Sequence, residues 1–324
     1  MLASNDKETE MSSDAEREVA HEITISADPA EVFRLIADVE NWPRVFPPSV
    51  FVDCVDRVGN TETIRIWATA NGEPKTWTSR RVLDPVAQRI TFQQEVTTPP
   101  VARMSGTWIV EPVGDGTCLR LLHTYRAVDD DPAGLAWIDE AVDRNSRSEL
   151  ASLKKTIESI TEHDDLTLSF VDSVDVAGSP KDVYDFINEA DLWTERLPHV
   201  ASVVLTEDEP GLQVLRMDTR TKDGSAHTTE SVRVCFPHDS IHYKQTTLPA
   251  LMSLHTGYWR FEENATGTTT ASSQHTVVIN PTTIAQVLGS DAGVAEARAF
   301  IREALGTNSR ATLEHAKRYA EARP

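Results

Sequence analysis

Cysteine, long apolar runs and positive charge are all scarce in this chain of 324 residues. Its three cysteines, Cys54, Cys118 and Cys235, are too few and too scattered for a disulfide framework or a zinc knuckle, so we interpret them as core residues in strands. No stretch approaches the roughly 18 consecutive apolar residues that span a bilayer, and no basic flank followed by an apolar block opens the chain. These absences predict a cytoplasmic protein without a membrane partner.

The charge balance argues against a nucleic-acid-binding protein. The chain has 31 Lys and Arg against 51 Asp and Glu, a net charge of -20, which repels a polyanion and predicts no nucleic-acid partner. Part of this charge lies in residues 1–22, which hold seven acidic and two basic residues and almost no apolar ones. Residues 1–17 are therefore predicted to be an acidic, disordered leader.

Motifs for covalent, metal and nucleotide chemistry are also missing. The sequence has no glycine-rich phosphate loop, no H-E-x-x-H, no nucleophile elbow and no Cys–His pair at metal-ligand spacing. We therefore predict a protein with no cofactor and no metal site.

The sequence contains an internal repeat. Residues 25–42 reappear as residues 176–193, and Arg81 and His123 recur as Arg233 and His275 at an offset of 152 positions. The length fits two domains. The polar and acidic run at residues 161–165 is the predicted boundary, which gives an N-terminal domain of residues 18–162 and a C-terminal domain of residues 163–324.

Each copy shows the same order of elements. In the first, a strand at residues 18–26 precedes Asp28 and Pro29, an N-cap followed by proline at the first helical position. Alternating polarity then predicts strands at residues 63–69, 76–83, 89–96, 107–111 and 119–128. An apolar stripe over residues 136–160 predicts a long helix. The fold class is α+β, with a long helix over a curved antiparallel sheet and a gap between them.

Two strands place polar groups on faces that belong inside. Trp77, Ser79 and Arg81 alternate along one strand, and His123 shares its face with Leu121 and Tyr125 on another. If both faces line the gap, Arg81 and His123 point into an apolar pocket. Each residue could also have a purely structural role. An arginine in a strand is commonly solvated, and a histidine among apolar residues is commonly a core residue whose ring nitrogens are hydrogen-bonded.

The long helix adds Glu149 and Asn145, which border its core-facing stripe, although a helix glutamate is commonly solvated. A guanidinium stays protonated and can stabilise a developing enolate, while an imidazole beside a carboxylate can move protons near pH 7. Arg81, His123 and Glu149 thus suit proton abstraction beside a carbonyl, carbon–carbon bond formation and loss of water.

Four motifs carry a family resemblance: N-W-P-R-V-F-P-P at residues 41–48, T-W-T-S-R-R-V at 76–82, M-S-G-T-W at 104–108 and R-N-S at 144–146. Across nearly all of the chain after the leader, the sequence resembles the didomain aromatase/cyclases of bacterial type II polyketide synthesis. These are tandem helix-grip domains of the START or Bet v 1-like superfamily, each a curved sheet around a long C-terminal helix with an interior pocket.

The resemblance implies an enzyme that binds a poly-β-ketone tethered to an acyl carrier protein and works beside other type II polyketide synthase enzymes. It would close the first ring by aldol condensation and dehydrate it. A ketoreduced chain and closure between carbons 7 and 12 are implied by the family alone. The implied catalytic residues are Arg81, His123 and Glu149, the last an aspartate in single-domain relatives. The predicted substrate-binding residues are Trp77, Ser79, Trp108, Tyr125, Asn145, Arg233, His275 and Asn308.

The second copy departs from this pattern. Thr312 stands where Glu149 stands in the first copy, and about eleven extra residues fall within residues 281–304, where we predict a lid or a short helix. We therefore expect carbon–carbon bond formation in the N-terminal pocket and dehydration or support in the C-terminal one.

A different class of function remains open on the sequence. The same gap can hold a lipid or another hydrophobic molecule by burial alone, which would make the protein a non-catalytic carrier.

Overall fold

The structure is a computed structural model that describes residues 16–70, 72–162, 164–220, 226–265 and 267–323. Of the predicted leader, residues 1–15 lie outside this part, and the first strand already begins at Arg17. α3 ends at Glu162 and β8 begins at Thr167, while the domain division at residues 162 and 163 stays a prediction. Within the described residues, no helix is long and apolar enough to cross a membrane.

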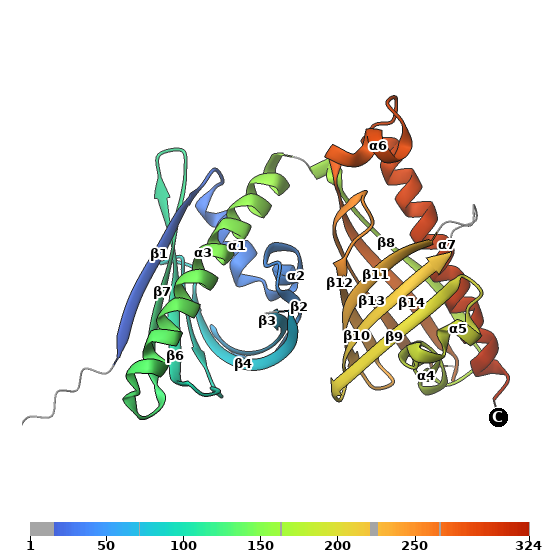
Figure 1. Cartoon of the computed structure of the whole chain (residues 1–324), viewed down its shortest axis with the longest axis horizontal. Helices are drawn as coiled ribbons and strands as arrows, with labels where there is room; N and C mark the ends of the chain where they lie inside the picture. Colours follow the sequence, from blue (N-terminus) through green and yellow to red (C-terminus); the bar gives the residue numbers. More distant parts are fainter. Residues whose placement is uncertain (1–15, 71, 163, 221–225, 266, 324) are drawn as a thin grey trace, which may run out of the picture. The chain divides into compact units, whose positions relative to one another are not determined.

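The first half contains a seven-stranded antiparallel sheet in the order β1-β7-β6-β5-β4-β3-β2 (Figure 1). Its strands are β1 (Arg17–Ile25), β2 (Ser49–Val58), β3 (Thr61–Ala70), β4 (Glu73–Asp84), β5 (Arg89–Gln94), β6 (Val101–Val113) and β7 (Gly116–Ala127). The five strands predicted after the first helix are confirmed. β2 was not predicted, because exposed charges interrupt its alternation after residue 52.

The helices of this half follow the capping and stripe signals. α1 (Pro29–Ala37) begins after Asp28, whose carboxylate accepts a hydrogen bond from the Ala30 N–H at 2.8 Å. Short turns η1 (Val39–Asn41), α2 (Trp42–Val45) and η2 (Val128–Asp130) precede the long helix α3 (Pro132–Glu162). α3 buries the predicted stripe of Val142, Ser146, Leu150, Leu153 and Ile157, and the side chain of Ile160, also predicted, lies outside the described part.

The second half repeats this plan in the order β8-β14-β13-β12-β11-β10-β9. Its strands are β8 (Thr167–Val176), β9 (Val200–Glu209), β10 (Leu212–Arg220), β11 (Ala226–Phe236), β12 (Ser240–Thr247), β13 (Met252–Glu263) and β14 (Thr269–Ile279). Its helices are η3 (Asp164–Leu166), α4 (Pro180–Asn188), η4 (Ala190–Leu192), α5 (Trp193–Arg196), η5 (Pro281–Thr283), α6 (Ile284–Leu288) and α7 (Val294–Glu321). The extra residues predicted in 281–304 form η5, α6 and the start of α7. The α+β class with two tandem helix-grip folds is confirmed.

Contacts group the chain into two compact units. One holds the ranges up to Ala37, Cys54–Ile64 and Trp77–Lys154, and the other holds Asp38–Asp53, Arg65–Thr76 and Lys155–Pro324. Within the second unit, Val232 and Val234 pack with Val50 and Trp67. This contact explains why the face of β11 opposite Arg233 is apolar.

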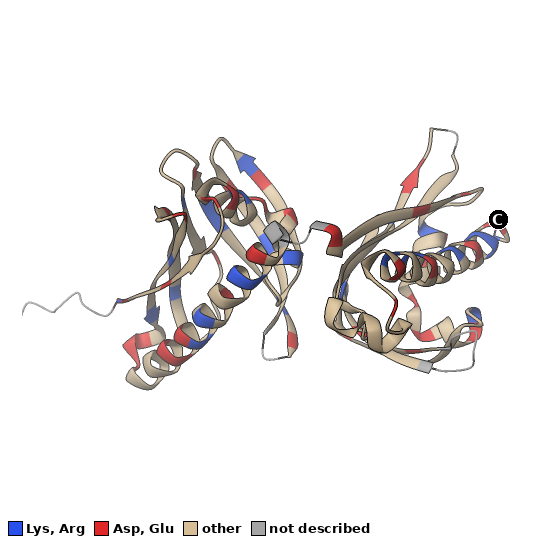
Figure 2. Cartoon of the chain, turned by 90° about the horizontal axis from the view of Figure 1, so that it is seen from above, with Lys and Arg blue, Asp and Glu red and all other residues tan. Residues whose placement is uncertain are grey.

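The three cysteines are free thiols, with Cys235 buried and Cys54 and Cys118 half-buried. Acidic and basic residues are interspersed along the exposed side of α3 (Figure 2). One such pair is Asp143 with Arg147, one helical turn apart and 2.9 Å between charged atoms.

Candidate functional site

One row of directly opposed residues crosses four strands of the first sheet. Arg81 on β4 faces Phe92 on β5, which faces Gly106 on β6, which faces His123 on β7. A Cβ at Gly106 would lie 2.5 Å from the Phe92 ring and would also clash with the carbonyl oxygen of Leu122. Glycine is therefore required for the ring of Phe92 to lie over this strand, where it meets the His123 ring edge-on with centroids 5.8 Å apart.

Arg81 is buried, as the strand alternation predicted, with 1% of its side chain exposed. Each of its guanidinium nitrogens donates to the protein: Nε to Glu62, Nη1 to the Ile36 carbonyl at 3.1 Å and Nη2 to the Ala37 carbonyl. These carbonyls end α1, where the helix dipole favours a cation. Glu62, equally buried, also pairs with Arg57 at 2.6 Å. The positive charge of Arg81 is therefore balanced by a buried carboxylate.

His123 is half-buried, and burial lowers its pKa to about 4, so the imidazole is neutral at pH 7. Its Nδ1 lies 3.5 Å from the hydroxyl of Ser146 on α3, a weak hydrogen bond. A neutral imidazole keeps one lone pair that can accept a proton.

Glu149 is half-buried on α3, and removal of its carboxylate from water raises its pKa to about 7. At neutral pH this group can either accept or donate a proton. Within the part of the chain described, no hydrogen bond joins Glu149 to His123, so the predicted pair is not formed in this structure. Asn145, also predicted for the site, is exposed.

The other residues predicted for the first site have structural contacts. Ser79 is buried and donates to the Gln93 carbonyl at 3.2 Å, and Trp108 is buried on β6. Tyr125 packs with Ile138 of α3 and donates its hydroxyl proton to Asp139 at 2.6 Å. Trp77 is half-buried on β4.

The second sheet has the same row with two exchanges. Gln213 on β10 faces Arg233 on β11, followed by Tyr243 on β12, Gly257 on β13 and His275 on β14. Tyr243 thus replaces the phenylalanine of the first row, and Gln213 stands where Glu62 stands. A Cβ at Gly257 would lie 2.5 Å from the Tyr243 hydroxyl, so the glycine leaves room for that hydroxyl.

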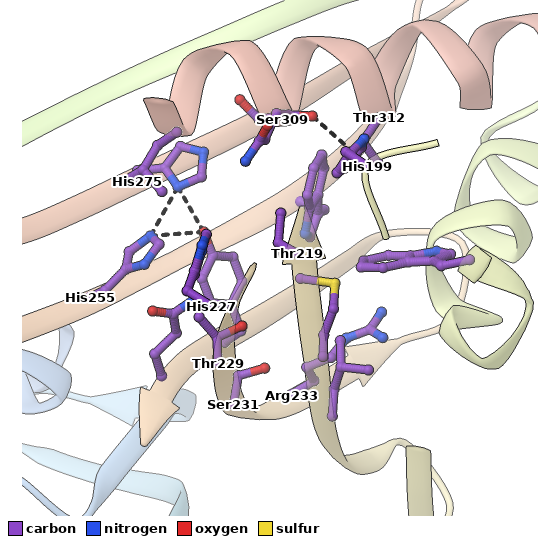
Figure 3. A pocket seen from close by; sticks show the side chains of 18 residues that line it. His199, Thr219, His227, Thr229, Ser231, Arg233, His255, His275, Ser309 and Thr312 are labelled. Atoms are coloured by element: carbon purple, nitrogen blue, oxygen red, sulfur yellow. Dashed lines mark hydrogen bonds between the residues drawn. The ribbon is translucent and has the colours of Figure 1, made fainter. Parts of the chain in front are cut away.

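A cavity of about 130 Å³ opens between this sheet and α7 (Figure 3). Among its lining residues are Arg233, His275 and Asn308, all three predicted, and Thr312, which stands at the position of Glu149. Thr312 donates its hydroxyl proton to the Asn308 carbonyl one turn earlier at 2.9 Å.

Arg233 is buried in the cavity wall with 2% exposure. Its Nη2 donates to the Ile187 carbonyl at the end of α4 at 2.7 Å, and its guanidinium lies over the Trp193 ring, 5.5 Å from the centroid. Its Nη1 has no hydrogen-bond partner among the described residues, and no ion pair involves Arg233 in this part of the chain.

Tyr243, His255 and His275 also line the cavity and form a polar cluster, of which Figure 3 labels the two histidines. The Tyr243 hydroxyl lies 2.9 Å from His275 Nδ1, and His255 Nε2 lies 3.0 Å from the same nitrogen and 3.4 Å from the hydroxyl. Burial lowers the pKa of both histidines, to about 4 for His275, and raises that of Tyr243. All three groups are therefore uncharged at pH 7.

Tyr243 and His255 were not predicted as site residues from the sequence. His255 lies four residues before Trp259, which aligns with Trp108 in the repeat, so strand alternation could have placed His255 on the same face. Tyr243 needed the register of β12 against β11. Among the described residues no cluster of three or more His, Cys, Asp or Glu could hold a metal ion.

Two helix-grip folds, each with an arginine and a histidine in one row across the concave sheet, define a class of cavity-forming proteins. The family described as polyketide cyclase/dehydrase and lipid transport matches the chain twice, over residues 16–158 and 167–321.

Relatives that match over nearly their full length have the same family assignment. The chain is 50% identical to a granaticin polyketide synthase bifunctional cyclase/dehydratase of Streptomyces virginiae, over 91% of this chain and 97% of the relative. It is 46% identical to the actinorhodin counterpart of Streptomyces coelicolor, over 94% and 98%. The crystal structure of the di-domain aromatase/cyclase BexL, from the BE-7585A pathway, matches with a TM-score of 0.91 and 68% identity over 95% of this chain and all of BexL.

StfQ, the di-domain aromatase/cyclase of the steffimycin pathway, matches with a TM-score of 0.85 and 35% identity, over 94% of this chain and 98% of StfQ. The chain therefore belongs to the polyketide cyclase/dehydrase family, among the didomain aromatase/cyclases of type II polyketide synthesis, and it is an enzyme of the cyclase/dehydratase type.

Proposed function

We propose that this enzyme binds a poly-β-ketone tethered to an acyl carrier protein, directs the aldol closure of its first ring and dehydrates that ring to an aromatic one. The observation that carries this proposal is the Arg–aromatic–Gly–His row, which is present in both halves. A β-ketone chain has acidic C–H groups between carbonyls. Its cyclisation needs proton transfer and stabilisation of enolate oxygens, which histidine, carboxyl and arginine groups can supply.

In the first half we propose proton transfer by His123 and Glu149. His123 is neutral at pH 7 and keeps a lone pair, and Glu149 has a pKa of about 7. The two groups thus supply a base and an acid without a metal or cofactor. Contact between Arg81 and the substrate stays a prediction. The hydrogen bonds of Arg81 to Glu62 and to α1 favour a positioning role, in which it fixes β3 and α1 around the site.

Finer features of the reaction belong to the proposal as well. These are a ketoreduced chain, closure between carbons 7 and 12, and action beside other type II polyketide synthase enzymes, with the carrier protein as partner. They are supported by the full-length likeness to relatives named as cyclase/dehydratases of polyketide synthases.

The test is to incubate the protein with a carrier-bound reduced polyketide and to determine the ring pattern of the products by mass spectrometry and NMR. Wild type should give one aromatic first ring. His123→Phe and Glu149→Gln should lower its yield tenfold or more relative to spontaneous products, whereas Ser148→Ala, an exposed change on the same helix, should not. If wild type protects the chain without changing the ring pattern, the protein binds polyketides without cyclising them and the proposal is wrong.

A further inference from the structure

The two halves differ in the charged groups around their buried arginines. Glu62, which neutralises Arg81, aligns with Gln213 in the repeat, and Gln213 lies directly opposite Arg233. Gln213 donates its amide protons to Glu207 at 2.7 Å and to Asn188 at 3.3 Å, and its own carbonyl oxygen is buried without a partner among the described residues. Arg81 thus has a buried carboxylate in direct contact, whereas among the described residues Arg233 has no ion pair and is reached only by the more distant charge of Glu207.

A buried guanidinium without a counter-charge has lost its hydration and gained little in return. Arg233 also leaves Nη1 unpaired, 98% of its surface is covered, and it lines a cavity, so an oxygen anion placed there would restore both a hydrogen bond and charge balance. Arg81 differs in this respect, because Glu62 already supplies the anion.

The polar cluster of Tyr243, His255 and His275 supplies a second donor. His275 Nε2 lies 3.2 Å from the Ser273 hydroxyl, so a proton on Nε2 leaves Nδ1 with one lone pair. Both the Tyr243 hydroxyl and His255 Nε2 lie within 3.0 Å of that Nδ1, but one lone pair satisfies only one donor fully. When His255 occupies it, the hydroxyl proton of Tyr243 is left with the Gln274 carbonyl oxygen at 3.4 Å, a long hydrogen bond that a ligand oxygen can replace.

The cavity has room for a small ring. Its volume of about 130 Å³ is similar to that of an engineered apolar cavity of about 150 Å³ that admits one benzene molecule. One six-membered ring fits, and Arg233 on β11 lies directly opposite Tyr243 on the neighbouring strand β12.

We propose that the C-terminal cavity is an oxyanion site for a single six-membered ring that carries a 1,3-dicarbonyl group in its enolate form, with Arg233 and Tyr243 as the two residues that contact the ligand oxygens. The assignment of the ligand as a 1,3-dicarbonyl compound rests on the proposed function. The anion preference of the cavity rests on Arg233 and Gln213 alone. The C-terminal cavity then binds the ring that cyclisation has formed.

The test uses small probes and the full-length protein. The probe is 1,3-cyclohexanedione at a pH where it is the enolate, and the comparison ligand is its enol methyl ether, which cannot ionise. Isothermal titration calorimetry should show that wild type binds the enolate at least tenfold more tightly than the ether. Equal affinities for the two would overturn the proposal.

Gln213→Glu should abolish the preference while leaving Arg233 in place, because it copies the Arg81–Glu62 arrangement. The double variant Gln213→Glu/Glu207→Gln makes the same change at constant net charge. Gln286→Glu, on the exposed side of α6, adds the same charge away from the cavity and should leave the preference unchanged. Retention of the full preference in both Gln213 variants, with folding confirmed by circular dichroism, would show that Arg233 does not hold the anion and would overturn the proposal.

Tyr243→Phe tests the second donor and copies the first row. It should weaken enolate binding about threefold to tenfold and change ether binding less, and an unchanged affinity ratio would remove Tyr243 from the site. None of these measurements requires polyketide turnover. A failed ring-pattern assay with intact enolate binding would therefore count against the proposed function and leave the anion site standing.

Discussion

The buried ion pair between Arg81 and Glu62 should contribute differently to stability from the unpaired Arg233. Both partners of the pair are 1% exposed. Removing one of them, as in Glu62→Gln, leaves an uncompensated buried charge, which typically costs about 3–5 kcal/mol. For a protein half of this size, 1 kcal/mol shifts the melting temperature by roughly 2–4 °C, so the variant should melt roughly 10 °C lower.

A double-mutant cycle separates the pair from its surroundings. Glu62→Gln, Arg81→Met and the double variant are compared by urea unfolding at pH 7. The double variant leaves no unpaired buried charge, since Arg57, the other partner of Glu62, is 61% exposed. Its destabilisation should therefore be smaller than the sum of the single changes, with a coupling energy of about 2 kcal/mol or more. A coupling below about 0.5 kcal/mol would refute the reasoning.

Arg233→Met is the matched comparison in the second half. It removes a buried charge that has no ion pair within the described residues, although it also gives up the hydrogen bond to the Ile187 carbonyl. We expect it to cost less than Arg81→Met, by about 1 kcal/mol or more. A larger cost at Arg233 would show that an anion already balances it.

Three further predictions concern pH and packing. The folded protein holds a proton on Glu149 up to a pKa of about 7, above the ordinary value, so stability should fall as pH rises from about 5 to 7 by up to roughly 3 kcal/mol. Glu149→Gln should flatten this part of the stability curve, and an unchanged slope in urea titrations would contradict the burial of the carboxylate. The pKa of His275 is lowered to about 4, so its contribution has the opposite sign: stability should be fully present above pH 6.5 and be lost as pH falls toward 4, by roughly 2–3 kcal/mol. His275→Gln should reduce that loss, and equal acid sensitivity of the two proteins would count against it. Gly257→Ala forces a Cβ to within 2.5 Å of the Tyr243 hydroxyl and should cost roughly 1–3 kcal/mol in thermal unfolding, whereas a neutral result would show that the row can spread.

The candidate site was only partly predictable. Alternation along β4 correctly predicted that Arg81 is buried, and the repeat correctly transferred this to Arg233. No hydrogen bond joins His123 and Glu149 in the described part of the chain, because a helical wheel gives the direction of a side chain and not its distance from a strand.

The sequence by itself determined the period of the repeat, the order of the elements and the face of each strand that turns inward, because these depend on local spacing along the chain. The tertiary structure decided which inward residues meet. Strand register, fixed by turns and bulges, places Glu62 against Arg81 and Gln213 against Arg233. It also places the Tyr243 hydroxyl over Gly257, within hydrogen-bond distance of His275. The charge balance of the two arginines follows from that register, since a counter-ion acts through space and leaves no periodic signal in the sequence.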